Sequence, residues 1–260
     1  MSSIKKVAVI GFGNIGVGVV RALYEKGANG LELVKVVDID LKKRRPVKIP
    51  KTMLSDDWKS VVDDPEIDII VELIGGIEPA RTIQLQALKN GKDVVTANKK
   101  LLAAEGKDIF SLAARLGRRV GFRASFVGCH SLIHEFQQAG TATKQFKRIY
   151  AILNGTSNYI LSTMSRDEKS FKEALKEAQV KGFAERDPSD DIDGNDTANK
   201  IRILVNLITN SYQKVPPFTI EGIRTITTQD IQYAAELGYS IKLVGVIEQI
   251  KGSFAVGVHP

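Results

Sequence analysis

The sequence predicts an α/β protein, in which a doubly wound parallel sheet is followed by a second domain of the α+β type. Up to about residue 128, short apolar runs of strand length alternate with segments of helical spacing. A glycine-rich turn directly follows the first of these runs. Beyond this point the regular alternation stops. The chain is therefore expected to form two domains, 1–128 and 129–260.

The elements of the first domain follow from apolar runs and from helical periodicity. A loop is expected at 45–53, where Pro46 and Pro50 interrupt the pattern. Strands are predicted near 5–10, 33–37, 68–73, 93–95 and 119–122, and helices near 15–26, 56–62, 79–90 and 105–116.

The second domain begins with a strand over 146–154 and a turn at 154–158. A helix over 159–164 follows, and an apolar helical face over 171–178 ends at Gly182. A long helix is expected at 196–210, and Pro216 with Pro217 breaks the chain after it. A helix over 229–237 and a strand over 241–250 complete the domain.

Composition limits the classes of function. The chain has 260 residues, of which 43% are hydrophobic, so it can bury real cores. No apolar run approaches the ~20 residues of a membrane span, and the first six residues lead into a strand without a signal peptide. We therefore expect a cytoplasmic protein that has no membrane partner.

Cysteine, histidine and charge exclude further classes. Cys129 is the only cysteine, and the three histidines have no metal-ligand spacing, so no metal site is predicted. The net charge of +7 is spread along the chain without a basic stripe between aromatics. This distribution favours anionic cofactors over nucleic acid.

Residues 11–16 carry the pattern G-x-G-x-x-G between a strand and a helix. Gly11 would make the tight turn, Gly13 would let a pyrophosphate approach the backbone, and Gly16 would let helix and strand pack closely. The helix N-terminus would offer N–H groups to phosphates. The alternative is a purely structural turn. The pattern predicts a Rossmann-type dinucleotide-binding domain, with the cofactor held by Gly11, Phe12, Gly13, Asn14, Ile15 and Gly16.

Two features disagree on which dinucleotide binds. Asp38 ends the second strand, where a carboxylate accepts from the ribose 2′-OH of NAD. The basic run 42–45, with Arg44 as the candidate, would instead hold the 2′-phosphate of NADP. The same run is also typical of a solvated loop. NAD and NADP both remain open.

Two loops are expected at the carboxyl ends of central strands, where open α/β sheets bind their ligands. Gly75 and Gly76 lie in the first loop, and Asn98 and Lys99 lie in the second. The two glycines would allow close approach to a nicotinamide. Simple turn chemistry is the alternative for both loops.

Residues 182–200 contain six carboxylates and end in Lys200. Asp196 and Lys200 lie four positions apart, so they share one face near the start of a helix. Such a group would suit a cationic small molecule that forms hydrogen bonds. A solvated acidic turn with an ordinary ion pair is the alternative.

The chain resembles homoserine dehydrogenases over nearly its whole length. The resemblance implies reversible hydride transfer between L-homoserine and L-aspartate 4-semialdehyde with NAD(P), in threonine and methionine biosynthesis. It also implies a homodimer formed through the sheet of the second domain. The matching segments are 11–16, 72–76, 94–99, 152–161, 182–200, 221–224 and 237–243.

The resemblance further implies roles for individual residues. Lys99 and Lys200 would flank the reacting oxygen and assist proton transfer, and Glu185 would bind the substrate ammonium. The remaining predicted substrate residues are Gly155, Thr156, Asp191 and Asp196, of which the two aspartates would also orient the lysines.

Two departures from the family are visible. Arg123 stands where the family has a glutamate, and His130 with Ser131 replaces an apolar residue and a proline, in a loop that contributes to a monovalent cation site in the family. Family members also continue beyond the equivalent of Pro260, so the second domain is expected to stop short. Two alternatives stay open: an impaired relative that only binds NAD(P) or an amino acid, and a dehydrogenase of another amino semialdehyde.

Overall fold

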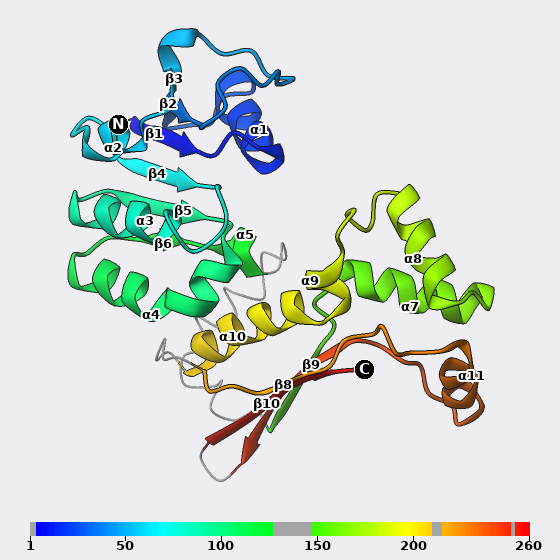
Figure 1. Cartoon of the computed structure of the whole chain (residues 1–260). Helices are drawn as coiled ribbons and strands as arrows, with labels where there is room; N and C mark the ends of the chain where they lie inside the picture. Colours follow the sequence, from blue (N-terminus) through cyan, green and yellow to red (C-terminus); the bar gives the residue numbers. More distant parts are fainter. Residues whose placement is uncertain (1–3, 127–146, 210–214, 251–252) are drawn as a thin grey trace. The chain divides into compact units, whose positions relative to one another are not determined.

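A computed structural model describes residues 4–126, 147–209, 215–250 and 253–260 (Figure 1). The described residues form two compact units, one up to residue 126 and one from residue 147 onward. Each unit has its own sheet, of six and four strands respectively. No helix in the described residues combines the length and the apolar character that crossing a bilayer requires.

The first unit alternates strands and helices in the predicted manner. A π-helical turn at Arg21–Glu25 extends α1, and a 3-10 turn at Lys51–Met53 precedes β3. The elements are β1 (Lys5–Ile10), α1 (Asn14–Val20), β2 (Leu31–Val37), β3 (Leu54–Ser55), α2 (Trp58–Asp63), β4 (Ile69–Glu72), α3 (Ala80–Lys89), β5 (Asp93–Thr96), α4 (Lys99–Arg115), β6 (Val120–Gly121) and α5 (Arg123–Phe126).

All six strands of this unit are parallel, in the order β3-β2-β1-β4-β5-β6. Val9 of β1 pairs with Val36 on one side and with Val71 on the other, and all three are buried. The chain moves outward from β1 in one direction and from β4 in the other. The doubly wound fold is thus confirmed, and its topological switch point lies between β1 and β4.

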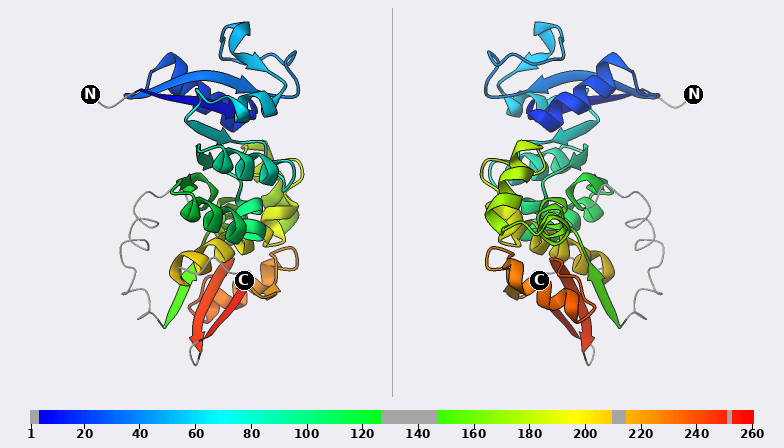
Figure 2. Two further views of the ribbon diagram at one scale, coloured as in Figure 1. Left: turned by 90° about the vertical axis from the view of Figure 1, so that its left-hand side faces the viewer. Right: turned by 90° about the vertical axis from the view of Figure 1, so that its right-hand side faces the viewer.

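The second unit is a mixed sheet with helices, in the order β7-β9-β10-β8. β9 and β10 form an antiparallel pair, visible side by side in both views of Figure 2. Helix α10 lies directly on β9, because a Cβ added at Gly245 would meet the Ile201 side chain at 2.5 Å. The elements are β7 (Arg148–Ala151), α7 (Gly155–Asp167), α8 (Phe171–Val180), α9 (Ser189–Ile192), α10 (Asn195–Thr209), β8 (Thr219–Ile220), α11 (Thr228–Glu236), β9 (Val244–Ile250) and β10 (Ser253–His259).

Two helices begin earlier than their periodicity predicts, and in both cases an asparagine cap is the reason. The Asn98 side chain accepts a hydrogen bond from Leu101 N, so α4 begins at Lys99 rather than near residue 105. The Asn154 side chain accepts from Ser157 N in the same way, so α7 begins at Gly155. Lys99 and Gly155 therefore lie on the first turns of helices and not in loops.

Besides the seven-residue strand β10, four short elements were not predicted. β3 and β8 have two residues each, and α5 and α9 have four, so none is long enough to show a period. β3 extends the first sheet and β8 extends the second. Helix α9 lies inside the acidic segment 182–200, where no helix was expected before residue 196.

Candidate functional site

The glycine turn between β1 and α1 is shaped by contacts that leave no room for side chains. Gly11 has a φ of +105°, and a Cβ there would lie 2.7 Å from the carbonyl carbon of Leu73. A Cβ at Gly16 would lie 2.0 Å from Gly11 O. At Gly13, by contrast, an added Cβ meets no described atom within 4 Å. The turn is therefore tightly packed inside and open at Gly13, as a backbone cradle for a pyrophosphate requires.

Asp38 lies directly beside this turn. Its Oδ2 accepts from Phe12 N at 2.7 Å, and its Oδ1 lies 3.0 Å from Arg45 Nη2. Burial raises the pKa of the carboxyl, but hydrogen bonds from Asp40 N and Phe12 N, together with the charge of Arg45, outweigh it and lower the pKa. Asp38 is thus a fixed acceptor at the end of β2.

Within the basic run it is Arg45, and not Arg44, that meets Asp38. The Arg45 side chain is only 7% exposed, donates to Phe12 O at 2.7 Å and lies over the Phe12 ring at 4.7 Å. Arg44 is exposed, and the contacts of Asp38 that the structure describes do not include Arg44. The prediction that Arg44 contacts the cofactor stays a prediction.

The two loops at the ends of β4 and β5 contact each other. Gly75 and Gly76 both have φ of +73°, which favours glycine. The Asn98 side chain donates from Nδ2 to Gly76 O at 2.7 Å while its Oδ1 caps α4. Lys99 is the first residue of that helix. The structure therefore brings these predicted residues together at one edge of the sheet.

In the second unit, Asn154 joins the two predicted aspartates. Its Nδ2 lies 2.6 Å from Asp191 Oδ1 and 2.9 Å from Asp196 Oδ2. The predicted pair of Asp196 and Lys200 is present, with Lys200 Nζ 2.7 Å from Asp196 Oδ2. The same ammonium donates to Leu153 O at 2.6 Å. Asn154 was not among the predicted site residues, although it stands in a segment that matches the family.

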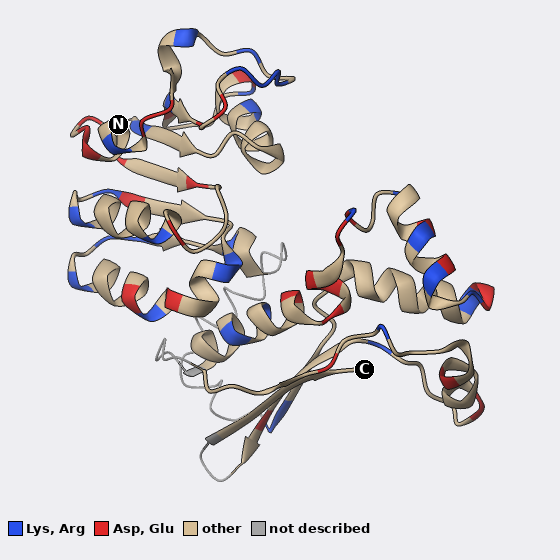
Figure 3. Cartoon of the chain, viewed as in Figure 1, with Lys and Arg blue, Asp and Glu red and all other residues tan. Residues whose placement is uncertain are grey.

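This cluster is enclosed and acidic. Asp196 is 3% exposed and the Lys200 side chain is 17% exposed. Two carboxylates against one ammonium leave an excess of negative charge, and the first turn of α10 favours such charge. Figure 3 shows acidic residues on α9 and at the start of α10, with basic residues farther along α10. The arrangement suits a ligand that carries both a cation and hydrogen-bonding groups.

Thr156 and Glu185 belong to segments that hydrogen bonds hold together. Thr156 Oγ1 donates to Phe183 O at 2.8 Å, and the Phe183 ring stacks on Tyr159 with centroids 4.4 Å apart. The Gln179 amide donates to Glu185 O at 3.1 Å. The Glu185 side chain itself is exposed, which leaves its carboxylate accessible to a ligand.

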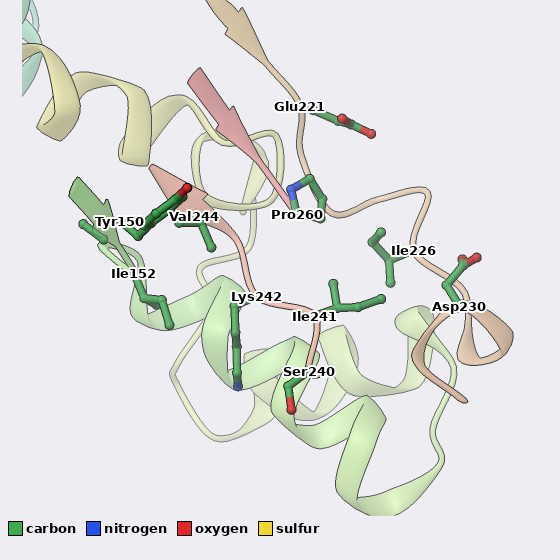
Figure 4. A pocket seen from close by; sticks show the side chains of 11 residues that line it. Tyr150, Ile152, Glu221, Ile226, Asp230, Ser240, Ile241, Lys242, Val244 and Pro260 are labelled. Atoms are coloured by element: carbon green, nitrogen blue, oxygen red, sulfur yellow. The ribbon is translucent and has the colours of Figure 1, made fainter. Parts of the chain in front are cut away.

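A separate pocket of about 680 Å³ lies in the second unit (Figure 4). Tyr150, Ile152 and Lys242 are among the residues that line it, and none of the predicted site residues does. The Lys242 side chain extends toward α7, where it donates to Ser162 Oγ at 2.8 Å. The Glu221 side chain points away from the pocket. These polar groups do not converge, so the pocket offers no chemistry for the predicted reaction.

The departures from the family are only partly described. Arg123 is exposed at the start of α5, whereas Cys129, His130 and Ser131 lie outside the described residues. Among the described residues, no group of three or more histidine, cysteine, aspartate or glutamate side chains could hold a metal ion. Lys99 and Lys200 lie in different units, so their shared role stays a prediction.

Comparisons with known proteins agree with both units. Residues 11–123 match the NAD binding domain of homoserine dehydrogenase, and residues 132–260 match the homoserine dehydrogenase domain. The homoserine dehydrogenase of Bacillus subtilis is 34% identical over 98% of this chain and 60% of its own length. That of Methanocaldococcus jannaschii is 33% identical over 96% of this chain and 82% of its own length.

A solved homoserine dehydrogenase from Thiobacillus denitrificans is 38% identical and superposes with a TM-score of 0.85, covering 98% of this chain and 61% of that one. This chain spans about 60% of the length of the first curated relatives that it matches. The Methanocaldococcus enzyme is more than 30% identical over most of both chains. Similarity of this extent indicates common ancestry, which a single shared motif would not. The chain belongs to the homoserine dehydrogenase family.

Proposed function

We propose that this protein is an NAD(P)-dependent homoserine dehydrogenase, which interconverts L-homoserine and L-aspartate 4-semialdehyde. The observation that carries the proposal is the enclosed cluster of Asn154, Asp191, Asp196 and Lys200. An amino-acid substrate brings an ammonium, a carboxylate and a hydroxyl. The cluster offers acceptors and one ammonium donor within hydrogen-bond distance of each other.

The first unit supports the cofactor part of the proposal. Gly11 and Gly16 close the turn, and Gly13 leaves the open approach that a pyrophosphate needs. The fixed acceptor Asp38 favours the ribose of NAD, and Arg45 beside it is a positive partner for a 2′-phosphate. We propose that either dinucleotide binds here. When bound, the nicotinamide would exchange the hydride.

The second unit would hold the substrate. Lys200 uses two of its three donor positions on Asp196 and Leu153 O, and the third would serve the substrate oxygen. In homoserine oxidation the hydroxyl loses a proton as its carbon loses a hydride. Lys200 and Lys99 would assist that proton transfer. The Glu185 carboxylate would accept hydrogen bonds from the substrate ammonium, and Asp191 and Asp196 would bind the remaining polar groups of the substrate.

The proposal includes a homodimer in the cytoplasm, where nicotinamide dinucleotides are available. The edge strand β7 of the described sheet exposes 63% of Tyr150, and Ile152 beyond it is 52% exposed. Pairing through such a sheet would cover both side chains. Analytical ultracentrifugation tests the dimer, since a monomer at micromolar concentration would refute it.

The decisive assay measures absorbance at 340 nm after the 260-residue chain is mixed with L-homoserine and NAD or NADP. We expect reduced cofactor to appear, and its rate with each dinucleotide gives the preference. L-Serine, which is one methylene shorter, serves as the control substrate and should react poorly. No signal from a chain that binds cofactor by calorimetry would refute the dehydrogenase and favour a binding protein.

A further inference from the structure

Glu72, the last residue of β4, is fully buried, with 0% of its surface exposed. The proposed reaction assigns no role to it. A buried carboxylate is costly unless hydrogen bonds satisfy it, so its partners indicate what it does in the fold.

Four donors converge on the Glu72 carboxylate. Oε1 accepts from Ile74 N at 2.9 Å and from Gly75 N at 3.4 Å. Oε2 accepts from Gln84 Nε2 at 2.7 Å and from Thr96 Oγ1 at 2.8 Å. A carboxylate accepts on both oxygens, whereas a glutamine would present an amide N–H to one pair of these donors. The four donors therefore require a side chain that accepts hydrogen bonds on both of its terminal atoms, as a carboxylate does.

The network continues from Thr96 to the second loop. Thr96 Oγ1 accepts from Asn98 N at 3.0 Å, and Asn98 Nδ2 donates to Gly76 O at 2.7 Å. Each loop thus contacts the other twice, once through Glu72 and Thr96 and once through Asn98 and Gly76. Thr96 and Asn98 are 1% and 6% exposed, so water competes little for these hydrogen bonds.

Both loops follow strands next to the switch point, where this fold binds the nicotinamide end of its ligand. We propose that Glu72 and Thr96 are positioning residues that hold segments 74–76 and 98–99 in the shape that receives the nicotinamide. The adenosine end would be held by residues 11–16 and Asp38. The backbone at 73–74 packs against Gly11, but the described hydrogen bonds of Glu72, Thr96 and Asn98 do not reach residues 11–16 or Asp38. The inference rests on the proposed cofactor and predicts a selective loss when the network is broken.

Isothermal titration tests this selectivity without relying on catalysis. NADH is compared with ADP-ribose, which lacks only the nicotinamide, and NADPH with 2′-phospho-ADP-ribose. In Glu72→Gln we expect the affinity for the reduced dinucleotides to fall about tenfold or more, since donors are left unsatisfied. The affinity for the two ligands without nicotinamide should stay within twofold.

Three further variants complete the test, the first as a second way to break the network and the other two as controls. Thr96→Val removes the hydroxyl while preserving the shape, and it should show the same selective loss. Thr96→Ser keeps the hydroxyl and should restore the affinity for NADH. Gly13→Ala places a methyl group at the pyrophosphate approach and should weaken all four ligands alike.

Each outcome decides a different question. Equal weakening of NADH and ADP-ribose in Glu72→Gln, or no change in either, overturns the inference and leaves the proposed function intact. A wild-type chain that binds none of the four ligands refutes the proposed cofactor and the inference with it. If Glu72→Gln does not fold, as judged by circular dichroism, Thr96→Val decides alone, because it leaves the turn contacts of Glu72 in place.

Discussion

The glycine turn of the first unit and the acidic cluster of the second are built on different principles. At Gly11 and Gly16 the backbone packs so closely that a single methyl group would collide with it. Around Asn154 the shape depends on which atoms donate and which accept. The turn should therefore be sensitive to added volume, and the cluster should be sensitive to changes of charge and hydrogen bonding that preserve volume.

The largest expected effect is on the cluster. Lys200→Ala should lower kcat for homoserine oxidation by at least ~100-fold, the low end for the loss of a proton-transfer group. The affinity for NAD(P), measured by calorimetry, should not change, because the glycine turn lies in the other unit. Lys176→Ala, at an exposed position on α8, is the matched control and should behave like the wild type. A kcat within threefold of the wild type would remove Lys200 from the mechanism.

The next largest effect is expected when a methyl group is added in the glycine turn. Gly16→Ala should lower the free energy of unfolding by about 1–3 kcal/mol, because its Cβ would lie 2.0 Å from Gly11 O. Gly18 lies in the same helix, and a Cβ there meets no described atom within 4 Å. Gly18→Ala should therefore raise that free energy by up to about 1 kcal/mol. Urea unfolding measures both, and equal effects would contradict the packing argument.

A change of chemistry without a change of volume sharpens the comparison. Asn154→Asp keeps an oxygen that can cap α7 but replaces the donor between Asp191 and Asp196 by a third carboxylate. We expect kcat/KM for homoserine to fall roughly tenfold or more, since a buried unmet partner costs about 1–3 kcal/mol.

Comparing Asn154→Ala with Asn154→Asp separates the two roles of this asparagine, the helix cap and the donor to the two aspartates. It removes the cap and the donor together, so it should also lower stability by about 1 kcal/mol. A steady-state assay with Asn154→Asp that shows unchanged kcat/KM would mean that the contact of Asn154 with the two aspartates does not matter to the reaction.

The cofactor half was the easier part to predict because its signals are local. The glycine spacing, the strand before it and the helix after it fall within about 20 residues. The i,i+4 pair of Asp196 and Lys200 is local in the same sense and was predicted correctly. The parallel sheet of the first unit follows from the alternation, whereas the order of its strands and the four-stranded sheet of the second unit were not predicted.

The parts that could not be predicted depend on long-range partners. Asn154 meets Asp191 and Asp196 from 37 and 42 positions away, and Glu72 meets Thr96 from 24 positions away. Glu72 did carry a signal, since a charged residue that ends a buried apolar strand needs donors. Within the run 42–45, only the fold decides that Arg45 is the residue that reaches Asp38.

The smallest effect concerns a carboxylate in the second unit that serves stability. Hydrogen bonds from Lys169, Lys181 and Tyr159 lower the pKa of Glu177 from 4.5 to about 2. A carboxyl with a lowered pKa in the folded state stabilises the fold above pH 4.5 and loses that contribution as the pH falls toward 2. Glu177→Gln should therefore have a slightly lower Tm than the wild type at pH 7.

The difference in Tm should shrink between pH 4.5 and pH 2, because the wild-type carboxyl is protonated over that range. Thermal melts at pH 7, 4 and 2 measure it, and Glu168→Gln is the control, since Glu168 follows α7 in the same unit and has no lysine partner among the described contacts. A constant difference at all three pH values would mean that Glu177 does not stabilise the fold through its charge, because glutamine has nearly the same shape and volume.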